Sequence, residues 1–170
     1  MCNATFIIRG AEVSELTKLA EIYWAAWHLA FSKHFPAESL ARVSVDDFED
    51  RWRGFFAEEN IRSFVYERDS DPLGFVTCRV QYGDPAEIVS MMVSPTCVRT
   101  GIGSKLMEKA LSHLFENECK TAILWVVREN TNARSFYERF GFSLSEERRF
   151  IQRYGIELCQ LRYEKQLDTI

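Results

Sequence analysis

Apolar residues recur every three or four positions in several long segments, the spacing of amphipathic helices. Ser44 followed by Asp47 has the form of a capping box, which predicts a helix start. Gly141 marks a helix end, because glycine readily adopts the left-handed conformation found there. The four helices predicted in this way cover residues 16–30, 44–56, 102–115 and 131–140.

Short apolar runs bounded by turn residues predict strands between these helices. Turns are expected at residues 69–72 and 82–85, which combine Asp, Ser, Gly and Pro. Residues 122–127 are apolar without interruption, the pattern of a strand buried on both faces. The seven predicted strands cover residues 6–8, 63–67, 73–81, 87–93, 122–127, 142–150 and 156–163.

The order of these elements predicts a single mixed α/β domain over residues 1–170, with about seven strands and four helices. A chain of 170 residues that is 46% hydrophobic can bury its own core. No repeat or low-complexity tract interrupts it. We therefore expect one domain.

The charge balance limits the partners. The formal net charge is −4, whereas sequence-independent nucleic-acid binding needs a basic surface that replaces phosphate counterions. A cationic or amine-bearing partner suits the chain better. No apolar run approaches the about 18 residues of a membrane span, and no export signal opens the sequence. We expect no nucleic acid, no membrane contact and a cytoplasmic location.

Cysteine and histidine spacing points away from disulfides and metal. The five cysteines form no C-x-x-C pair, and none of the three histidines has a partner at zinc-site spacing. We expect reduced thiols and no bound metal, with Cys97 a packing residue. An aromatic stripe at helical spacing belongs to a core or walls a site for an amine. The stripe comprises Trp24, Trp27, His28, Phe31 and His34.

The first candidate motif is the loop between a predicted strand and a predicted helix, residues 93–106. Gly101 and Gly103 leave the backbone accessible, and the helix start offers unpaired N–H groups and a partial positive charge to an anion. Arg99 and Thr100 add a cation and a hydroxyl. The spacing matches neither a Rossmann fingerprint nor a Walker loop. The alternative is structural, with one glycine in a turn and the other at a close helix–sheet contact.

The second candidate motif begins at Asn130. If a helix starts there, Asn130, Ala133 and Tyr137 share one face, because seven residues are close to two turns. This face combines an amide, a small residue and a phenol, which suits a polar extended ligand. The alternative places Tyr137 in an aromatic core cluster with Phe136, Phe140 and Phe142.

Together, the two motifs resemble the GCN5-related N-acetyltransferase (GNAT) family. Residues 86–103 are similar to its main acetyl-CoA motif, and residues 130–142 to its second motif. The helical N-terminal region and the strand-rich tail extend the resemblance over essentially the whole chain. One position departs from the pattern: the family usually has Gln or Arg three residues before the first glycine, and here Val98 stands there beside Arg99.

The resemblance implies a mixed, mostly antiparallel sheet that is splayed in the middle, with acetyl-CoA between the parted strands. The strand of residues 87–93 would carry a bulge. Its backbone would pair with the pantetheine arm, and the helix start would hold the pyrophosphate. The predicted cofactor-binding residues are Met91, Met92, Val93, Val98, Arg99, Thr100, Gly101, Ile102, Gly103, Ser104 and Asn130.

The implied reaction is direct attack of a neutral primary amine on the thioester, with no acyl-enzyme. A backbone N–H near Met92 or Val93 would stabilise the oxyanion. Tyr137 stands at the family's general-acid position and would protonate the CoA thiolate. Glu87 is the candidate base; since a free Glu pKa is about 4.3, burial must raise it or a water must relay the proton. Alternatively, Glu87 is an edge residue or an ion-pair partner.

Two other functional classes stay open: a catalytically inactive CoA-binding regulatory module, and an interaction domain without a cofactor. The acceptor would be a small-molecule or peptide amine. A net charge of −4 is only a weak bias toward polyamines, aminoglycosides or basic peptides. The oligomeric state is not determined, and a homodimer stays open.

Overall fold

The computed structural model describes residues 6–81 and 85–167, and its strands form one sheet in the order β1-β2-β3-β4-β5-β7-β6. All neighbouring pairs are antiparallel except β4 and β5, which are parallel. This confirms the predicted mixed α/β fold. The strands are β1 (Phe6–Gly10), β2 (Ile61–Arg68), β3 (Asp71–Arg79), β4 (Ala86–Val93), β5 (Thr121–Val127), β6 (Ser143–Arg153) and β7 (Ile156–Gln166).

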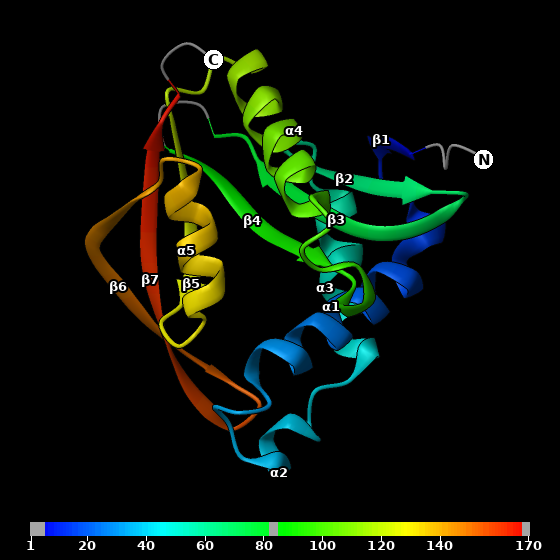
Figure 1. The fold of residues 1–170 in the computed structure, drawn as a ribbon, viewed down its shortest axis with the longest axis vertical. Coiled ribbons are helices and arrows are strands. Elements are labelled where there is room, and N and C mark those ends of the chain that lie inside the picture. The colour runs from blue at the N-terminus through cyan, green and yellow to red at the C-terminus, as the bar shows by residue number, and fades with distance from the viewer. Residues whose placement is uncertain (1–5, 82–84, 168–170) are drawn as a thin grey trace.

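Helices cover both faces of the sheet (Figure 1), with α4 and α5 on one side and α1 and α3 on the other. The four predicted helices are all present. The sequence pattern missed a one-turn helix after Pro36 and two 3₁₀ turns. The helices are α1 (Leu16–Phe31), α2 (Ala37–Leu40), α3 (Val45–Ala57), α4 (Ile102–Glu116) and α5 (Thr131–Arg139), and the 3₁₀ turns are η1 (Val13–Glu15) and η2 (Pro95–Cys97).

Local signals set several of these boundaries. The predicted capping box is present: the Asp47 amide donates to Ser44 Oγ, and the Ser44 amide donates to the Asp47 carboxylate. Gly141 follows α5 with φ +80°, as expected for a glycine at a helix end. The predicted turn at residues 82–85 lies largely outside the described residues, as does Cys2.

The sheet separates two hydrophobic cores. One lies under α4 and α5 and contains Leu106, Leu124 and Tyr163. The other lies under α1 and α3 and contains Trp27, Trp52 and Phe75. We call these sides the α4/α5 face and the α1/α3 face. A side chain can be assigned to a face because successive residues of a strand point in opposite directions.

Strands β4 and β5 pair over three positions only, from Ala86↔Ala122 to Ile88↔Leu124. Beyond them the two strands diverge (Figure 1). We call the unpaired lengths, residues 89–93 of β4 and 125–127 of β5, the parted segments. The register of β4 against β3 jumps from Ile88 to Ser90, so Val89 is an extra residue, that is, a β-bulge.

The parting corrects one prediction. Burial on both faces was expected for residues 122–127, but burial alternates along β5. Ala122, Leu124 and Val126 are buried on the α4/α5 face, whereas Ile123 and Trp125 are half-buried. Val127 points to the same face as Ile123 and Trp125 but is buried in the α1/α3 core, so this face is covered at the end of β5 and less fully before it.

Two further observations concern the described chain as a whole. The thiols of Cys78, Cys97, Cys119 and Cys159 are free, and Cys97 is buried as predicted for a packing residue. Among the helices that the structure describes, none is long and apolar enough to cross a membrane.

Candidate acetyl-transfer site

The edge of β4 that faces β5 has backbone groups without a strand partner. The Ser94 amide donates to the Leu73 carbonyl on the β3 side at 2.8 Å. N–H groups alternate in direction along a strand, so those of Met91 and Val93 point away from β3 and toward β5. Within the parted segments no β5 residue pairs with them. This exposed length of backbone could accept an extended ligand as an added strand.

The chain passes from this edge into α4 through the predicted glycine loop. Gly101 has φ +88° and is the N-cap of α4, and Arg99 also has positive φ, at +63°. No side chain caps this helix end. The first amides of an α-helix have no intrahelical acceptor, so the Ile102, Gly103 and Ser104 N–H groups are available to an anion.

The side chains of the loop contribute less than its backbone. Thr100 Oγ1 donates to the Cys97 carbonyl at 2.6 Å, which uses its hydrogen within the loop. Val98 is 46% exposed, and Arg99 is exposed without an ion-pair partner among the described residues. The loop therefore offers mainly peptide groups to an anion.

The two motifs are adjacent in the structure. A Cβ atom on Gly103 would lie 3.6 Å from the Phe136 ring of α5 and 3.8 Å from Val93 Cγ2. These are ordinary contacts, so helix–sheet packing does not itself require a glycine at 103. The close contact is elsewhere: at Gly74 of β3 a Cβ atom would lie 2.9 Å from the Met92 carbonyl oxygen.

Tyr137 lies on α5 beside the parted segments. It packs edge-on against Phe136 at 5.6 Å and Phe142 at 6.2 Å between ring centroids, so the aromatic cluster of the structural alternative is present. Burial raises the pKa of Tyr137 to about 12, and Tyr23 contributes further. The phenol is therefore protonated at neutral pH, the form in which it can donate a proton.

The influence of Tyr23 on Tyr137 connects the two faces. Tyr23 belongs to α1 and packs on Phe48 and Trp52 in the α1/α3 core, whereas Tyr137 packs on the α4/α5 core. A continuous sheet would separate these phenols. Their electrostatic coupling indicates that they are near each other, and the gap between β4 and β5 is where the sheet allows this.

Asn130 has a structural contact in addition to any ligand role. Its Oδ1 accepts a hydrogen bond of 3.1 Å from the Ala133 amide and caps α5. Such a cap stabilises the helix by about 1 kcal/mol. Asn130 thus orients the helix that carries Tyr137.

Glu87 lies on the other face. Its Oε2 accepts a hydrogen bond of 3.2 Å from Arg79 Nη1, and Arg79 also reaches Glu58 at the end of α3. The ion-pair alternative for this carboxylate is therefore realised. Glu87 lies in the paired part of β4 on the α1/α3 face, whereas Tyr137 packs on the α4/α5 face.

Sequence reasoning missed Ser90. It pairs with Thr77, whose hydroxyl interacts with Trp52 of α3, so Ser90 also lies on the α1/α3 face. Its Oγ is buried and has no hydrogen-bond partner among the described residues. A serine within the parted segment of β4 gave no sequence signal. Tyr23 was also missed, because helical periodicity marked it only as a core position.

The aromatic stripe of α1 is mainly core. Trp27 and Phe31 are each 4% exposed, which supports the packing alternative for them. Trp24 donates its indole N–H to the Val43 carbonyl at 2.9 Å, and His34 is exposed. His28 Nε2 is buried and has no partner in the described part of the chain.

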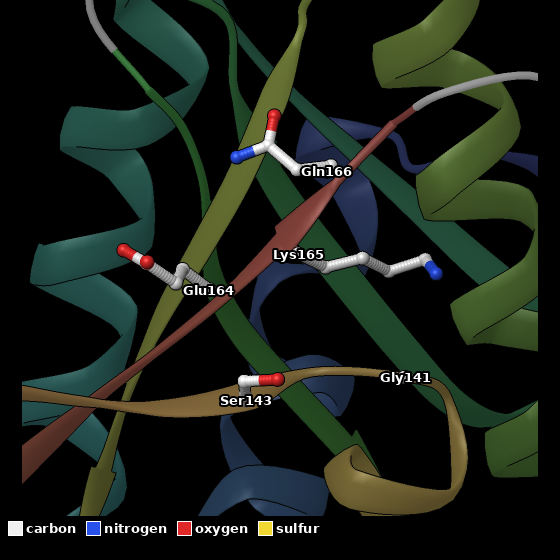
Figure 2. A pocket seen from close by; sticks show the side chains of 5 residues that line it. All are labelled: Gly141, Ser143, Glu164, Lys165 and Gln166. Carbon is white, nitrogen blue, oxygen red and sulfur yellow. The ribbon is translucent and has the colours of Figure 1, made fainter.

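A pocket of about 320 Å³ lies away from these residues, at the end of α5 and the paired strands β6 and β7 (Figure 2). Glu164 and Lys165 leave β7 on opposite sides in this view. None of the predicted site residues lines it. The pocket is lined by Gly141, Ser143, Glu164, Lys165 and Gln166.

An open strand edge that leads into a glycine-capped helix, with a partly buried phenol on the next helix, is the arrangement that the family resemblance implied. The model of the acetyltransferase (GNAT) family matches residues 16–142. The chain belongs to this family. Family membership makes it a relative of N-acetyltransferases, and the seven-stranded sheet is the GNAT fold.

Individual GNAT relatives agree with this assignment. An uncharacterized N-acetyltransferase of Archaeoglobus fulgidus is 30% identical over 76% of this chain and 88% of its own length. A mycothiol acetyltransferase of Streptomyces griseus is 32% identical over 72% of this chain, which spans only 40% of that protein. The crystal structure of a PaiA N-acetyltransferase from Thermoplasma acidophilum with coenzyme A has a TM-score of 0.75 and 19% identity, over 95% of this chain and 99% of that one.

Proposed function

We propose that this protein transfers an acetyl group from acetyl-CoA to a primary amine of a small molecule or peptide. The observation that carries the proposal is the open edge of β4, which leads into the uncapped start of α4, with Phe136, the neighbour of Tyr137 on α5, in contact at Gly103. The coenzyme A in the structure of the T. acidophilum relative supports the choice of donor.

Backbone groups would make most of the donor contacts. The free N–H and C=O groups of Met91 and Val93 suit the amide-rich pantetheine arm, since both partners then pair as strands do. The amides of Ile102, Gly103 and Ser104 suit the pyrophosphate, helped by the helix dipole. These contacts need no particular side chain, so Val98 at the departing position does not weaken them.

The reaction forms a bond from the amine nitrogen to the acetyl carbon and breaks the bond from that carbon to sulfur. The Val93 N–H points into the parted segments and could stabilise negative charge on the acetyl oxygen. Tyr137 would donate its proton to the departing sulfur. The acceptor amine would enter from the α1/α3 face, which we call the acceptor face. Glu87 lies on this face and would receive the amine proton, directly or through water.

The test is thiol release from acetyl-CoA by the purified protein with a panel of primary amines, together with calorimetric binding of acetyl-CoA. We expect binding, and amine-dependent thiol release in equal amount to the acetylated amine. Gly103→Glu should remove both, because its carboxylate would occupy the anion site. Binding without transfer to any amine would identify an inactive CoA-binding module instead. Absence of binding would contradict the proposal.

A further inference from the structure

Three guanidinium groups converge on the α1/α3 face, near the acceptor side of the parted segments. Arg51 comes from α3, and Arg149 and Arg153 come from β6. Burial lowers the pKa of Arg51, and the charge of Arg153 lowers it further. Burial also lowers the pKa of Arg149; the charge of Glu87 opposes this shift, and the charges of Arg153 and Arg51 add to it. The elements that carry them are in contact: the ring of Tyr154, next to Arg153, lies 6.4 Å from that of Phe48, one turn before Arg51 on α3.

Arg149 is held in place by two contacts. Its guanidinium carbon lies 4.3 Å from the centre of the Trp125 ring in the parted segment of β5. Its Nε donates a hydrogen bond of 2.7 Å to Gln160 Oε1. These contacts use the face of the guanidinium and one nitrogen. The two terminal nitrogens are left for another acceptor, and this pair can bind a carboxylate or phosphate in a fixed geometry.

The three arginines have no carboxylate partners of their own in the part of the chain that the structure describes. Among the described residues, no carboxylate lies within ion-pair distance of Arg51, Arg149 or Arg153. Glu87 influences both Arg51 and Arg149, but it is already hydrogen-bonded to Arg79. Arg51 and Arg153 are half-buried, whereas Arg149 is exposed. Partly desolvated cations without partners are costly, so an incoming anion would be stabilised there.

We infer that the acceptor carries an anionic group, a carboxylate or a phosphate, in addition to its amine, and that Arg51 and Arg149 bind this group. Arg153 adds to the positive field. The inference rests on the proposed acetyl transfer and specifies its substrate class. It also reverses the weak preference for polycations that the net charge of −4 suggested, because the local charge at the acceptor face is positive.

The test compares matched amines in the thiol-release assay. The pairs are L-phenylalanine with phenethylamine, β-alanine with its amide, and O-phosphoethanolamine with ethanolamine. We expect kcat/KM at least tenfold higher for the anionic member of one or more pairs. The first two pairs report on a carboxylate and the third on a phosphate.

Variants assign the effect to the arginines. Arg51→Gln and Arg149→Gln should raise KM for the anionic acceptor at least tenfold, with a smaller effect on kcat and on the neutral partner. Arg148→Gln is the matched control, since Arg148 is exposed and points to the opposite face of β6. Arg148→Gln should leave KM and kcat unchanged for both the anionic acceptor and its neutral partner.

The outcomes separate the inference from the proposed function. Equal kcat/KM for anionic and neutral members would overturn the inference and leave acetyl transfer intact. If no amine is acetylated, the proposed function fails. Calorimetric binding of N-acetyl-L-phenylalanine in the presence of CoA then tests the anion site by itself. Binding that Arg149→Gln abolishes would support the site. Absence of binding, or binding unchanged in Arg149→Gln, would overturn it.

Discussion

Among single residues, Tyr137 combines a structural and a chemical role. Its ring packs against Phe136 and Phe142, while its hydroxyl is the proposed proton donor. Removing only the hydroxyl separates the two roles, because the ring of Phe would keep the packing. We expect Tyr137→Phe to lower kcat by about 100-fold or more, as for loss of a general acid. Calorimetric affinity for acetyl-CoA should change little.

The control for Tyr137→Phe is Tyr66→Phe. Tyr66 lies on β2 and stacks on Phe6, and β3 separates it from the parted segment of β4. The same chemical change there should leave kcat unaltered. Equal turnover by the parent and Tyr137→Phe would refute the proposed proton donor.

The pH dependence of Tyr137 is a second prediction for this residue. The reaction needs the protonated phenol, and burial raises its pKa to about 12. The proton is therefore kept below that pH and lost only as the pH rises through it. A phenol with the ordinary pKa of about 10 would be about half ionised at pH 10. We expect kcat not to fall as the pH rises to about 10. A fall of kcat near pH 8–9 that is absent in Tyr137→Phe would contradict this.

At the scale of elements, the contact of β3, β4 and α4 fixes the geometry of the candidate site. Gly74 allows β3 to approach both the Met92 carbonyl and the side chains of Leu106 and Ile102. A Cβ at this position would overpack the contact. We expect Gly74→Ala to lower the free energy of unfolding by about 1–3 kcal/mol in denaturant titrations. Affinity for acetyl-CoA should fall as well, since β4 must shift.

Gly54 supplies the matched control for Gly74→Ala. It lies inside α3 with open space around it. Gly54→Ala should stabilise the protein by about 0.5–1 kcal/mol, because alanine loses less conformational entropy in a helix. Destabilisation of equal size by both substitutions would show that the contact of β3 with α4 is not the cause.

At the scale of the whole molecule, bound acetyl-CoA should connect the sheet with the helices on its α4/α5 face. The proposed contacts come from β4, from α4 and from α5, which meet at the parted segments. At about a hundredfold its dissociation constant, acetyl-CoA should add about 2.7 kcal/mol to the free energy of unfolding. For a chain of this size the melting temperature should rise by roughly 5–10 °C. The melting temperature of Gly103→Glu should not rise. If acetyl-CoA leaves the melting temperature of the parent protein unchanged, an interaction domain without a cofactor is favoured.

Most elements could be predicted because their signals are local. The spacing of apolar residues located all four long helices, and the Ser44–Asp47 pair marked the start of α3. The error at residues 122–127 has a different origin. An apolar run indicates a strand, but whether both faces are covered depends on where the neighbouring strand goes.

The candidate site divides in the same way. Gly101, Gly103 and Tyr137 could be singled out because their motifs are contiguous in the chain. Ser90, Tyr23 and the three arginines could not, since their spacing carries no pattern. They matter only as neighbours of the parted segments, and that proximity arises from strand order.

The sequence by itself determined the helices and strands, the order of the two motifs and the resemblance to acetyltransferases, because periodicity, caps and motif spacing are properties of neighbouring residues. Only the tertiary structure decided which face each side chain occupies and where charge accumulates. Arg51 and Arg149 are 98 positions apart in the numbering of the chain, yet the fold brings α3 and β6 to the same face of the sheet. A net charge of −4 could not reveal this local excess of positive charge, because an electrostatic field depends on distances in space.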